Sequence, residues 1–534
     1  MSIFPLKTDL PPEHCFDRPL DQKEYLIGGE LLKWSGRMHE VLSPVCVMED
    51  GEIRRVVLGS YPMLDAVEAK KALDAAVKAY DSGKGQWPTM NAEERLKYFE
   101  KFVIKMKEKR DEVVKLLMWE IGKSLPDSQK EFDRTIAYII DTIEAAKELD
   151  RVSSRFQIED GIIAQIRRAP LGVVLCMGPF NYPLNETFTT LIPALITGNT
   201  VIFKPPKFGV LLHQPLLEIF RTVFPAGVVN TVYGDGAETI GSVMQSGLLN
   251  AFAFIGTSKV ADILKKQHPH PHRMKSILGL EAKNPAIILA DANLKNAVDE
   301  CVLGSLSYNG QRCTALKIIF VHRSIAAEFV KMLADSVDRL KCGMPWENGV
   351  NITPLPETGK SGYLKDLVDD AVSKGAKIVN KTGALVEETF FHPAVLYPVN
   401  STMKVFHEEQ FGPVVPVIPF DDVNEPVDYI ISSNYGQQAA VFGTDPEVIA
   451  EIIDPLSNQV CRININCQCQ RGPDVYPFTG RKDSAEGTLS VTDALRVFTI
   501  RTLVAGKSTG LNKEIFNDIV RERRSNFLST DFIF

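Results

Sequence analysis

Residues 172–206 read GVVLCMGPFNYPLNETFTTLIPALITGNTVIFKPP, and this stretch decides the fold. It begins with a short apolar run, continues through a segment of helical length and ends in a second apolar run. The order strand, helix, strand predicts a βαβ unit, because parallel strands need a crossover connection of this length. Since helices then cover both faces of the sheet, we expect its strands to be buried on both sides.

The same alternation continues along the chain. Short apolar runs recur at residues 228–234 (VVNTVYG), 251–256 (AFAFIG) and 286–290 (AIILA), with segments of helical length between them. A second α/β series follows from about Ala286 to Val460, and a long helical pattern precedes the first strand, from about Asn91 to Leu149. With its 534 residues, the sequence predicts an α/β protein of two or three domains.

The composition excludes several classes of protein. Charged residues make up 24% of the chain and the net charge is -7, which disfavours nucleic acid or an acidic membrane as the main partner. The N-terminus lacks an apolar signal region, and no apolar run approaches the roughly 18 residues that span a bilayer. Nine scattered cysteines favour reduced thiols over a disulfide framework. We therefore expect a soluble, cytoplasmic protein.

Four loops follow the predicted strands at the edge where α/β proteins bind ligands. They read MGPFNYP, FKPPKFG, VYGDGAETIG and FIGTSK, and helices that follow such loops present free N–H groups to phosphates. None is the G-x-G-x-x-G fingerprint, so the loops alone predict a nucleotide only weakly. Lys204 and Lys207 are more informative, because two ammonium groups near a strand end could hold a ribose hydroxyl and a 2′-phosphate. The alternative is that both are solvated loop lysines.

Cys313 has a distinctive local sequence. It lies in NGQRCTA, where Gly310 permits an unusual backbone or a close approach of a ligand, and Arg312 adds a positive charge next to the thiol. A nearby cation favours the thiolate, which is the nucleophilic form of cysteine. The local sequence therefore admits two interpretations, a catalytic nucleophile or an inert buried thiol.

Six motifs occur in a fixed order along the chain. They are PFNYP (179–183), FKPP (203–206), FIGTS (254–258), AKNPAIIL (282–289), NGQRC (309–313) and EEQFGP (408–413). In this order and spacing they resemble the aldehyde dehydrogenase superfamily, and the resemblance covers the chain from about Tyr25 to Ala505. It implies an α/β aldehyde dehydrogenase fold with a Rossmann-like cofactor domain (1–150 and 169–278), an α/β catalytic domain (279–489), a small bridging and oligomerisation element (151–168 and 490–505) and a C-terminal tail (506–534).

Within the superfamily the sequence is most similar to the non-phosphorylating, NADP-dependent glyceraldehyde-3-phosphate dehydrogenases. Those enzymes bind the substrate phosphate and hydroxyls mainly through arginines and a tyrosine. The substrate-binding positions in this chain are Arg134, Tyr182, Arg312, Thr314 and Arg471. Guanidinium groups suit phosphate because they donate paired, charge-assisted hydrogen bonds. The resemblance implies irreversible, NADP-dependent oxidation of a small phosphorylated aldehyde, with glyceraldehyde 3-phosphate of glycolysis oxidised to 3-phosphoglycerate.

The family mechanism implies roles for individual residues. Cys313 would attack the aldehyde carbon, and the amide of Asn181 with the backbone N–H of Cys313 would hold the oxyanion of the thiohemiacetal. Hydride transfer would leave a thioester, which a base-activated water would hydrolyse. The residues implied to bind the cofactor are Gly178, Lys204, Lys207, Thr257, Glu409 and Phe411. The charge of Lys207 favours NADP, with NAD as the alternative.

The chain departs from the family at the residues that handle protons. Hydrolytic members carry the general base as the glutamate of ELGGKNP, and alignment of KNP puts Gly279 at that position, with Glu281 two residues later. In an extended strand these two residues share a face and lie about 7 Å apart, so Glu281 is a candidate for the relocated base. A lysine that is thought to relay protons is replaced by Thr190, with Glu186 one helical turn before it.

Three functions are open at this point. The first is hydrolysis of the thioester with Glu281 or Glu186 as the base. The second is transfer of the acyl group to coenzyme A, since superfamily members that use this acceptor also lack the usual glutamate. The third is a regulatory or structural cofactor-binding protein. The retained Cys313, Asn181 and arginines argue against the third.

Three further expectations concern assembly, the tail and two cysteines. The resemblance implies a homodimer or homotetramer, because the bridging strands would otherwise expose sheet edges. We expect the tail to dock its last aromatic residues on its own or a neighbouring subunit. Cys467 and Cys469 form a C-x-C pair that could be oxidised or trap a soft metal, but two ligands are too few to predict a metal site.

Overall fold

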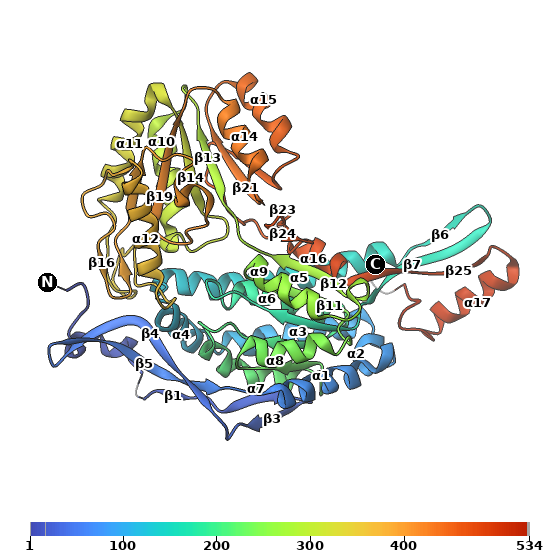
Figure 1. The fold of residues 1–534 in the computed structure, drawn as a ribbon. Coiled ribbons are helices and arrows are strands. Elements are labelled where there is room, and N and C mark those ends of the chain that lie inside the picture. The colour runs from blue at the N-terminus through green and yellow to red at the C-terminus, as the bar shows by residue number, and fades with distance from the viewer. Residues whose placement is uncertain (1, 17, 531–534) are drawn as a thin grey trace.

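The computed structural model describes residues 2–16 and 18–530. Figure 1 shows two α/β units, one above the other, and an arm that projects from one side. The first unit, at the bottom of the view, is built around a six-stranded sheet, and the second around a seven-stranded sheet. This arrangement confirms the predicted α/β fold class.

The predicted βαβ stretch forms the centre of the first unit. Strand β8 (Val173–Met177) pairs in parallel with β9 (Thr200–Lys204), and α6 (Asn185–Ile196) lies between them in the chain. The sheet order is β10-β9-β8-β11-β12-β24, and only β24 is antiparallel to its neighbour. The other strands are β10 (Val229–Thr231), β11 (Ala251–Ile255), β12 (Lys275–Gly279) and β24 (Ala485–Glu486). Strand β24 comes from the C-terminal part of the chain, and the sequence pattern did not predict it.

Helices pack around this sheet. The long helical segment forms α3 (Ala92–Lys107), α4 (Arg110–Ile121) and α5 (Leu125–Ser153). Gly122 ends α4 with a φ of 65°, and the Ser124 hydroxyl then caps α5 by accepting from the N–H of Asp127 at 3.2 Å. The other helices of this unit are α1 (Ala66–Tyr80), α2 (Gln86–Thr89), α7 (Gln214–Val223), α8 (Gly236–Gln245) and α9 (Ser258–Gln267).

The second unit contains the later α/β series. Its sheet order is β15-β18-β19-β14-β13-β21-β22, and only β15 is antiparallel to its neighbour. Its strands are β13 (Asn284–Ile288), β14 (Leu316–His322), β15 (Lys377–Ile378), β18 (Ala394–Tyr397), β19 (Val414–Phe420), β21 (Gln438–Phe442) and β22 (Arg462–Ile465). Its helices are α10 (Leu294–Leu306), α11 (Arg323–Val337), α12 (Lys360–Ser373), α13 (Lys404–His407), α14 (Asn424–Ser432) and α15 (Pro446–Leu456). Strand β13 is buried over its whole length, as expected for a central parallel strand.

Smaller sheets complete the two units. Strand β5 (Glu52–Pro62) lies between β1 (Leu20–Asp21) and β4 (Met38–Glu49). The remaining pairs are β2 (Glu24–Ile27) with β3 (Glu30–Lys33), β16 (Val386–Glu387) with β17 (Phe390–Phe391), and β20 (Tyr435–Gly436) with β23 (Arg481–Lys482). Within the described residues, no helix combines the length and the apolar surface needed to cross a membrane.

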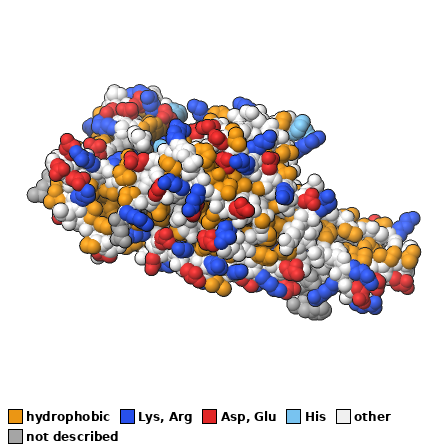
Figure 2. Space-filling model, turned by 90° about the horizontal axis from the view of Figure 1, so that it is seen from below, with side chains coloured by type: hydrophobic (Ala, Val, Ile, Leu, Met, Phe, Trp, Pro, Cys, Tyr) orange, Lys and Arg blue, Asp and Glu red, His pale blue; other side chains and the backbone are white. Residues whose placement is uncertain are grey.

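The arm consists of three antiparallel strands and one helix. Its sheet order is β25-β7-β6, with β6 (Phe156–Glu159), β7 (Ile162–Pro170) and β25 (Thr499–Lys507). Helix α16 (Val491–Val497) precedes β25, and α17 (Gly510–Arg521) follows it. Large apolar side chains are exposed along the arm, among them Ile158, Ile500, Leu503 and Leu511. Figure 2 shows hydrophobic side chains on this projecting part, mixed with charged ones.

After α17 the chain returns to the base of the arm. The amide of Gln165 donates to the carbonyl of Ser529 at 2.7 Å, and a guanidinium N–H of Arg167 donates to the same carbonyl at 2.8 Å. Leu528 is only 5% exposed, whereas Leu511 on α17 is 67% exposed. The tail therefore docks on its own chain through residues before its last aromatics, which lie outside the described residues.

The docked tail predicts a stability difference between two identical substitutions. Leu528→Ala is expected to lower the free energy of unfolding by about 2 kcal/mol, because it removes a buried apolar side chain. Leu385→Ala removes a leucine that is 58% exposed and lies outside both the tail and the arm, and is expected to change it by less than about 0.5 kcal/mol. Urea unfolding of the two variants measures the difference, and equal effects would show that the tail is not docked at Leu528.

Candidate active site

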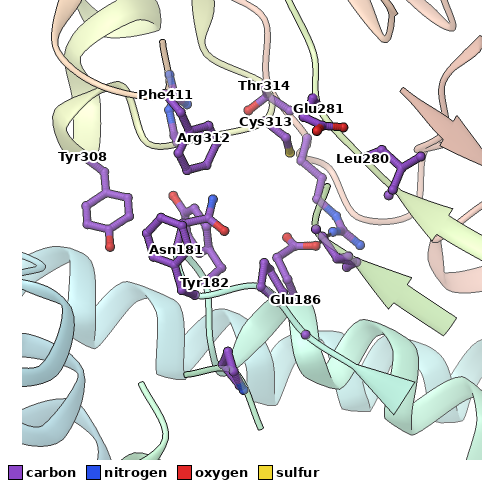
Figure 3. A pocket seen from close by; sticks show the side chains of 18 of the residues that line it. Asn181, Tyr182, Glu186, Leu280, Glu281, Tyr308, Arg312, Cys313, Thr314 and Phe411 are labelled. Carbon is purple, nitrogen blue, oxygen red and sulfur yellow. Dashed lines mark hydrogen bonds and ion pairs between the residues drawn. The ribbon is translucent and has the colours of Figure 1, made fainter. Parts of the chain in front are cut away.

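A cavity of about 1070 Å³ is lined by residues of both units. Figure 3 shows Asn181 and Glu186 on one side of it and Cys313 on the other, with the sulfur pointing into the space between them. Every residue predicted to form the site lines this cavity. They are Arg134, Gly178, Asn181, Tyr182, Lys204, Lys207, Thr257, Glu281, Arg312, Cys313, Thr314, Glu409, Phe411 and Arg471. The structure thus brings the whole predicted set together.

The loop before Cys313 has an unusual backbone. Tyr308, Asn309 and Gly310 have φ values of 50°, 55° and 69°, so three consecutive residues are left-handed. A Cβ on Gly310 would lie 2.6 Å from the carbonyl oxygen of Ser305, which only glycine avoids. Asn309 tolerates this conformation and fixes it, because its side chain accepts from the backbone N–H of Thr353 at 2.9 Å. The loop is therefore rigidly placed at the cavity.

Burial dominates the environment of the Cys313 thiol. Burial raises the pKa of Cys313 above its usual value, and the ammonium of Lys317 opposes this effect only in part. Arg312 contributes little, because its guanidinium donates to the carbonyl of Gly304 at 2.8 Å and to the side chain of Gln468 at 3.2 Å. The effect of Arg312, which was expected to favour the thiolate, is thus outweighed by the loss of water around the sulfur, which raises the pKa.

Lys317 links the cysteine loop to the predicted cofactor side. Its ammonium donates to the carbonyl of Cys313 at 3.1 Å and to the carboxylate of Glu409 at 2.5 Å. Glu409 also accepts from the backbone N–H of Ala282 at 3.1 Å. The carbonyl of Cys313 receives a second bond from the amide of Asn284 at 2.7 Å. Neither Lys317 nor Asn284 was predicted, because each acts through a contact with the backbone.

Asn181 joins the first unit to the cysteine loop. Its amide nitrogen donates to the carbonyl of Gln311 at 2.7 Å. The backbone carbonyl of Asn181 accepts from the ammonium of Lys123 at 2.9 Å, and that ammonium is 3.6 Å from the ring centre of Tyr182. Lys123 is fully buried and paired with Glu131. Lys123 was missed in the sequence, where it lies inside the stretch predicted as helical.

The cavity wall on the first unit contains features that suit a nucleotide. A Cβ on Gly178 would lie 1.7 Å from the hydroxyl oxygen of Thr187, so the close packing there requires glycine. Thr257 caps α9 by accepting from the N–H of Val260, and both residues line the cavity at the start of that helix. Burial lowers the pKa of Lys204 to about 8, opposed by Asp235. Lys207 is exposed at the rim.

Phe411 lines the cavity from the second unit. Its φ is 44°, an uncommon backbone for an aromatic residue, and its ring centre is 5.8 Å from that of Phe180. The buried Lys283 fixes the loop that carries it, by donating to the carbonyl of Glu408 at 2.7 Å and to the side chain of Gln410 at 2.7 Å. The EEQFGP motif therefore has a fixed shape, and Phe411 is presented to the cavity.

Glu281 is bound to the start of a helix. Its carboxylate accepts from the backbone N–H of Ser258 at 2.8 Å, at the N-terminus of α9, where a negative charge is stabilised. At Gly279, a Cβ would have ordinary contacts with Ile255 at 3.4 Å and Leu489 at 3.6 Å. The position of the usual glutamate therefore has room for a Cβ, and Gly279 lines the cavity. Thr190, at the usual lysine position, is buried and donates to the carbonyl of Thr187 at 2.8 Å within its own helix.

Two of the predicted phosphate-binding arginines are paired with carboxylates. Arg134 makes two hydrogen bonds to Asp474, at 2.8 Å and 2.6 Å. Arg471 forms an ion pair with Glu186, its Nε lies 3.2 Å from Asp474, and it donates to the carbonyl of Leu489 at 2.9 Å. Burial lowers the pKa of Arg471 to about 10. Asp474 was not predicted, although it lies in the same QRGPD stretch as Arg471.

The C-x-C pair is not part of the cavity lining. Cys469 is buried and accepts from the amide of Asn464 at 3.5 Å, and Cys467 is half-buried. In the described part of the chain, no group of three or more His, Cys, Asp or Glu residues is arranged to hold a metal ion. The two cysteines therefore lack the additional ligands that a metal site requires.

The aldehyde dehydrogenase family model matches residues 51–504. The chain belongs to this family. The NADP-dependent glyceraldehyde-3-phosphate dehydrogenase of Streptococcus equinus is 34% identical over 455 residues, which are 83% of this chain and 91% of that protein. Its counterpart in Pisum sativum is 31% identical, over 82% of this chain and 87% of that protein. A lactaldehyde dehydrogenase of Methanococcus aeolicus is 28% identical, over 84% of this chain and 94% of that protein.

Solved aldehyde dehydrogenase structures agree with this assignment. The NADP-dependent glyceraldehyde-3-phosphate dehydrogenase of Bacillus halodurans, complexed with NADP, superposes with a TM-score of 0.83 at 29% identity. The superposition covers 92% of this chain and all of that chain. The Escherichia coli lactaldehyde dehydrogenase gives a TM-score of 0.83 at 25% identity, with 92% and 100% covered. The aldehyde dehydrogenase fold that the motifs implied is thus confirmed, and α17 with the tail follows the matched region.

The raised pKa of Cys313 predicts how the thiol reacts with iodoacetamide. The thiolate is the reactive form, so the rate of alkylation at Cys313 is expected to rise about tenfold per pH unit up to about pH 8.5. Mass spectrometry of the modified peptide follows Cys313 alone, and Cys313→Ser provides the blank. A rate that is already constant below about pH 8 would mean that the pKa is lowered and not raised.

Proposed function

We propose that this aldehyde dehydrogenase oxidises a small phosphorylated aldehyde with NADP. The preferred substrate is D-glyceraldehyde 3-phosphate and the product is 3-phosphoglycerate. One observation carries the proposal: three arginines, Arg134, Arg312 and Arg471, line the same cavity as Cys313 and Asn181. An apolar aldehyde needs no guanidinium groups, whereas a phosphate gains charge-assisted hydrogen bonds from them.

The cofactor proposal rests on the wall formed by the first unit. Lys204 would bind the adenosine ribose and Lys207 the 2′-phosphate, which favours NADP over NAD. The close packing at Gly178 and the N–H groups at the start of α9 suit a pyrophosphate. Glu409 and Phe411 would bind the nicotinamide ribose and ring. The cofactor, when bound, supplies the acceptor for the hydride.

The chemistry of the chain's own residues follows from their positions. The Cys313 thiolate attacks the aldehyde carbon, and Asn181 Nδ2 with the Cys313 N–H stabilises the oxyanion of the thiohemiacetal. When the oxyanion returns its electron pair to carbon, the hydride leaves and a thioester on Cys313 is formed. Water then attacks the thioester, a carboxylate of the chain takes its proton, and the acid leaves with the thiolate restored.

Glu281 is the proposed acceptor of the water's proton. It lines the cavity with Cys313, but its carboxylate is held by the Ser258 N–H. That N–H is also well placed to donate to a pyrophosphate, so cofactor binding would release Glu281 toward the cavity. The expected strand does not extend to Glu281, because β12 ends at Gly279; the residue would act from the connection between β12 and β13.

A pair of variants tests the base. Glu281→Gln is expected to keep the initial burst of reduced cofactor and to slow steady turnover roughly 10²- to 10⁴-fold, because the amide cannot take a proton. Adding Gly279→Glu to that variant is expected to raise steady turnover at least about tenfold, since a Cβ fits at this position and Gly279 lines the cavity. Rapid-mixing absorbance with glyceraldehyde 3-phosphate and NADP separates the two phases.

Other outcomes of the same experiment would support other functions. Full turnover in Glu281→Gln would remove Glu281 from this role. A burst without turnover in the unaltered chain, followed by turnover when free coenzyme A is added, would favour acyl transfer to the thiol of coenzyme A. The glycine at position 279, where hydrolytic members carry the base, also favours this alternative. NADP binding without any burst would contradict an oxidising function.

The arm supports the proposal of a homodimer or homotetramer. Its exposed apolar residues and its free strand edges are typical of surfaces that pair with another subunit. Leu503→Asp is expected to shift the protein to monomers, because it places a charge in the apolar contact. Val372→Asp, at an exposed apolar position on α12, is the control. Sedimentation velocity measures the assembly, and an unchanged assembly in Leu503→Asp would contradict the arm as the interface.

A further inference from the structure

Arg471 is held by two carboxylates of the chain itself. The guanidinium is 6% exposed, forms an ion pair with Glu186, and has its Nε 3.2 Å from Asp474. Asp474 in turn is bound by Arg134 through two hydrogen bonds. The four side chains form a continuous row, Glu186 to Arg471 to Asp474 to Arg134, and all but Asp474 line the cavity.

The formal charges of this row cancel. Two guanidinium groups and two carboxylates leave no net positive charge for a phosphate dianion. In a buried site an added dianion would be repelled by carboxylates that are only a few ångströms away, and this repulsion is weakly screened. A phosphate can therefore bind Arg471 well only if one carboxylate dissociates from its guanidinium.

The contacts identify Glu186 as the carboxylate that leaves. Asp474 is bound by both arginines, and together they lower its pKa although burial alone would raise it. Glu186 has Arg471 as its one charged partner among the described residues, and its other contact is a long hydrogen bond of 3.4 Å from the amide of Asn185. Loss of one ion pair releases Glu186, whereas Asp474 would lose three nitrogen contacts.

Two buried donors mark where the phosphate would go. The Nε atoms of Arg471 and Arg312 are buried and have no hydrogen-bond acceptor in the described part of the chain. Arg471 Nε has Asp474 within ion-pair distance but without hydrogen-bond geometry. Arg312 has no carboxylate within ion-pair distance among the described residues, and donates to neutral oxygens only. Each of these donors is available to an entering oxyanion.

We propose that Glu186 is an internal competitor for the substrate phosphate. It occupies Arg471 until a dianion replaces it, and the exchange sets how tightly the site binds a phosphorylated aldehyde. An uncharged aldehyde cannot compensate Arg471 and leaves the ion pair in place. A phosphorylated aldehyde restores the charge balance of Arg471 and opens the pair. The inference rests on the proposed function for the name of the substrate, and on the ion pair for the exchange.

Binding of inorganic phosphate tests the exchange without any reaction. Glu186→Gln is expected to bind phosphate about tenfold more tightly than the unaltered chain, because the competing charge is gone. Glu186→Asp keeps the charge on a shorter side chain, weakens the pair and should bind with an intermediate affinity. Titration calorimetry on the full chain measures the three dissociation constants. If Glu186→Gln does not fold, Glu186→Asp still has to bind more tightly than the unaltered chain.

A second pocket carboxylate separates exchange from a general charge effect. Glu408 lines the cavity and contacts Tyr363, not Arg471. Glu408→Gln removes the same charge and is expected to change phosphate affinity by less than about twofold. Equal tightening in Glu408→Gln and Glu186→Gln would overturn the exchange, as would unchanged affinity in both Glu186 variants.

Kinetics then distinguish this inference from the proposed function. In Glu186→Gln the KM for glyceraldehyde 3-phosphate is expected to fall by a factor similar to that for phosphate, while the KM for unphosphorylated glyceraldehyde stays unchanged. Tighter phosphate binding without any oxidation of glyceraldehyde 3-phosphate would support the exchange and contradict the proposed function. Oxidation of that substrate with unchanged phosphate affinity in the Glu186 variants would support the proposed function and contradict the exchange.

Discussion

The buried ion pair between Lys123 and Glu131 is the interaction on which the site depends. Both side chains are fully buried, so each charge needs the other, and removing one would leave an unpaired charge at a cost of several kcal/mol. Lys123 holds the carbonyl of Asn181 and lies against the rings of Tyr182 and Tyr308. Glu131 accepts the backbone N–H groups at the start of α6. One pair thus contacts the loop that carries Asn181, the helix that follows it and the loop that leads to Cys313.

Much of the fold could be predicted because its signals are local. The apolar runs of residues 172–206 became β8 and β9, since central parallel strands must be apolar on both faces. The helical segment before them was predicted as one stretch, but it is broken at Gly122, whose left-handed backbone no periodicity reveals. Strand β24 has two residues and pairs with β12 from a distant part of the chain. Such a strand has no sequence pattern of its own.

The predicted residues that line the cavity came from motifs, and their partners were not predicted. Motifs mark side chains that face the cavity, whereas Lys317 and Asp474 act by holding other groups, which only the folded chain reveals. Two carboxylates of the cavity, Glu281 and Glu186, also share a property in the structure. Glu281 binds the N-terminus of α9 and Glu186 binds Arg471, so each occupies a position suited to a phosphate. The chain fills its anion sites with its own carboxylates.

Lys317 connects two motifs of the cavity, NGQRC and EEQFGP, that are far apart in the sequence. One ammonium serves both the carbonyl of Cys313 and the carboxylate of Glu409. A change in the partners of Glu409 would reach the Cys313 loop through this one ammonium. Lys317 opposes the rise in the pKa of Cys313 that burial causes, so a shift of its charge toward that loop would make the thiol more acidic.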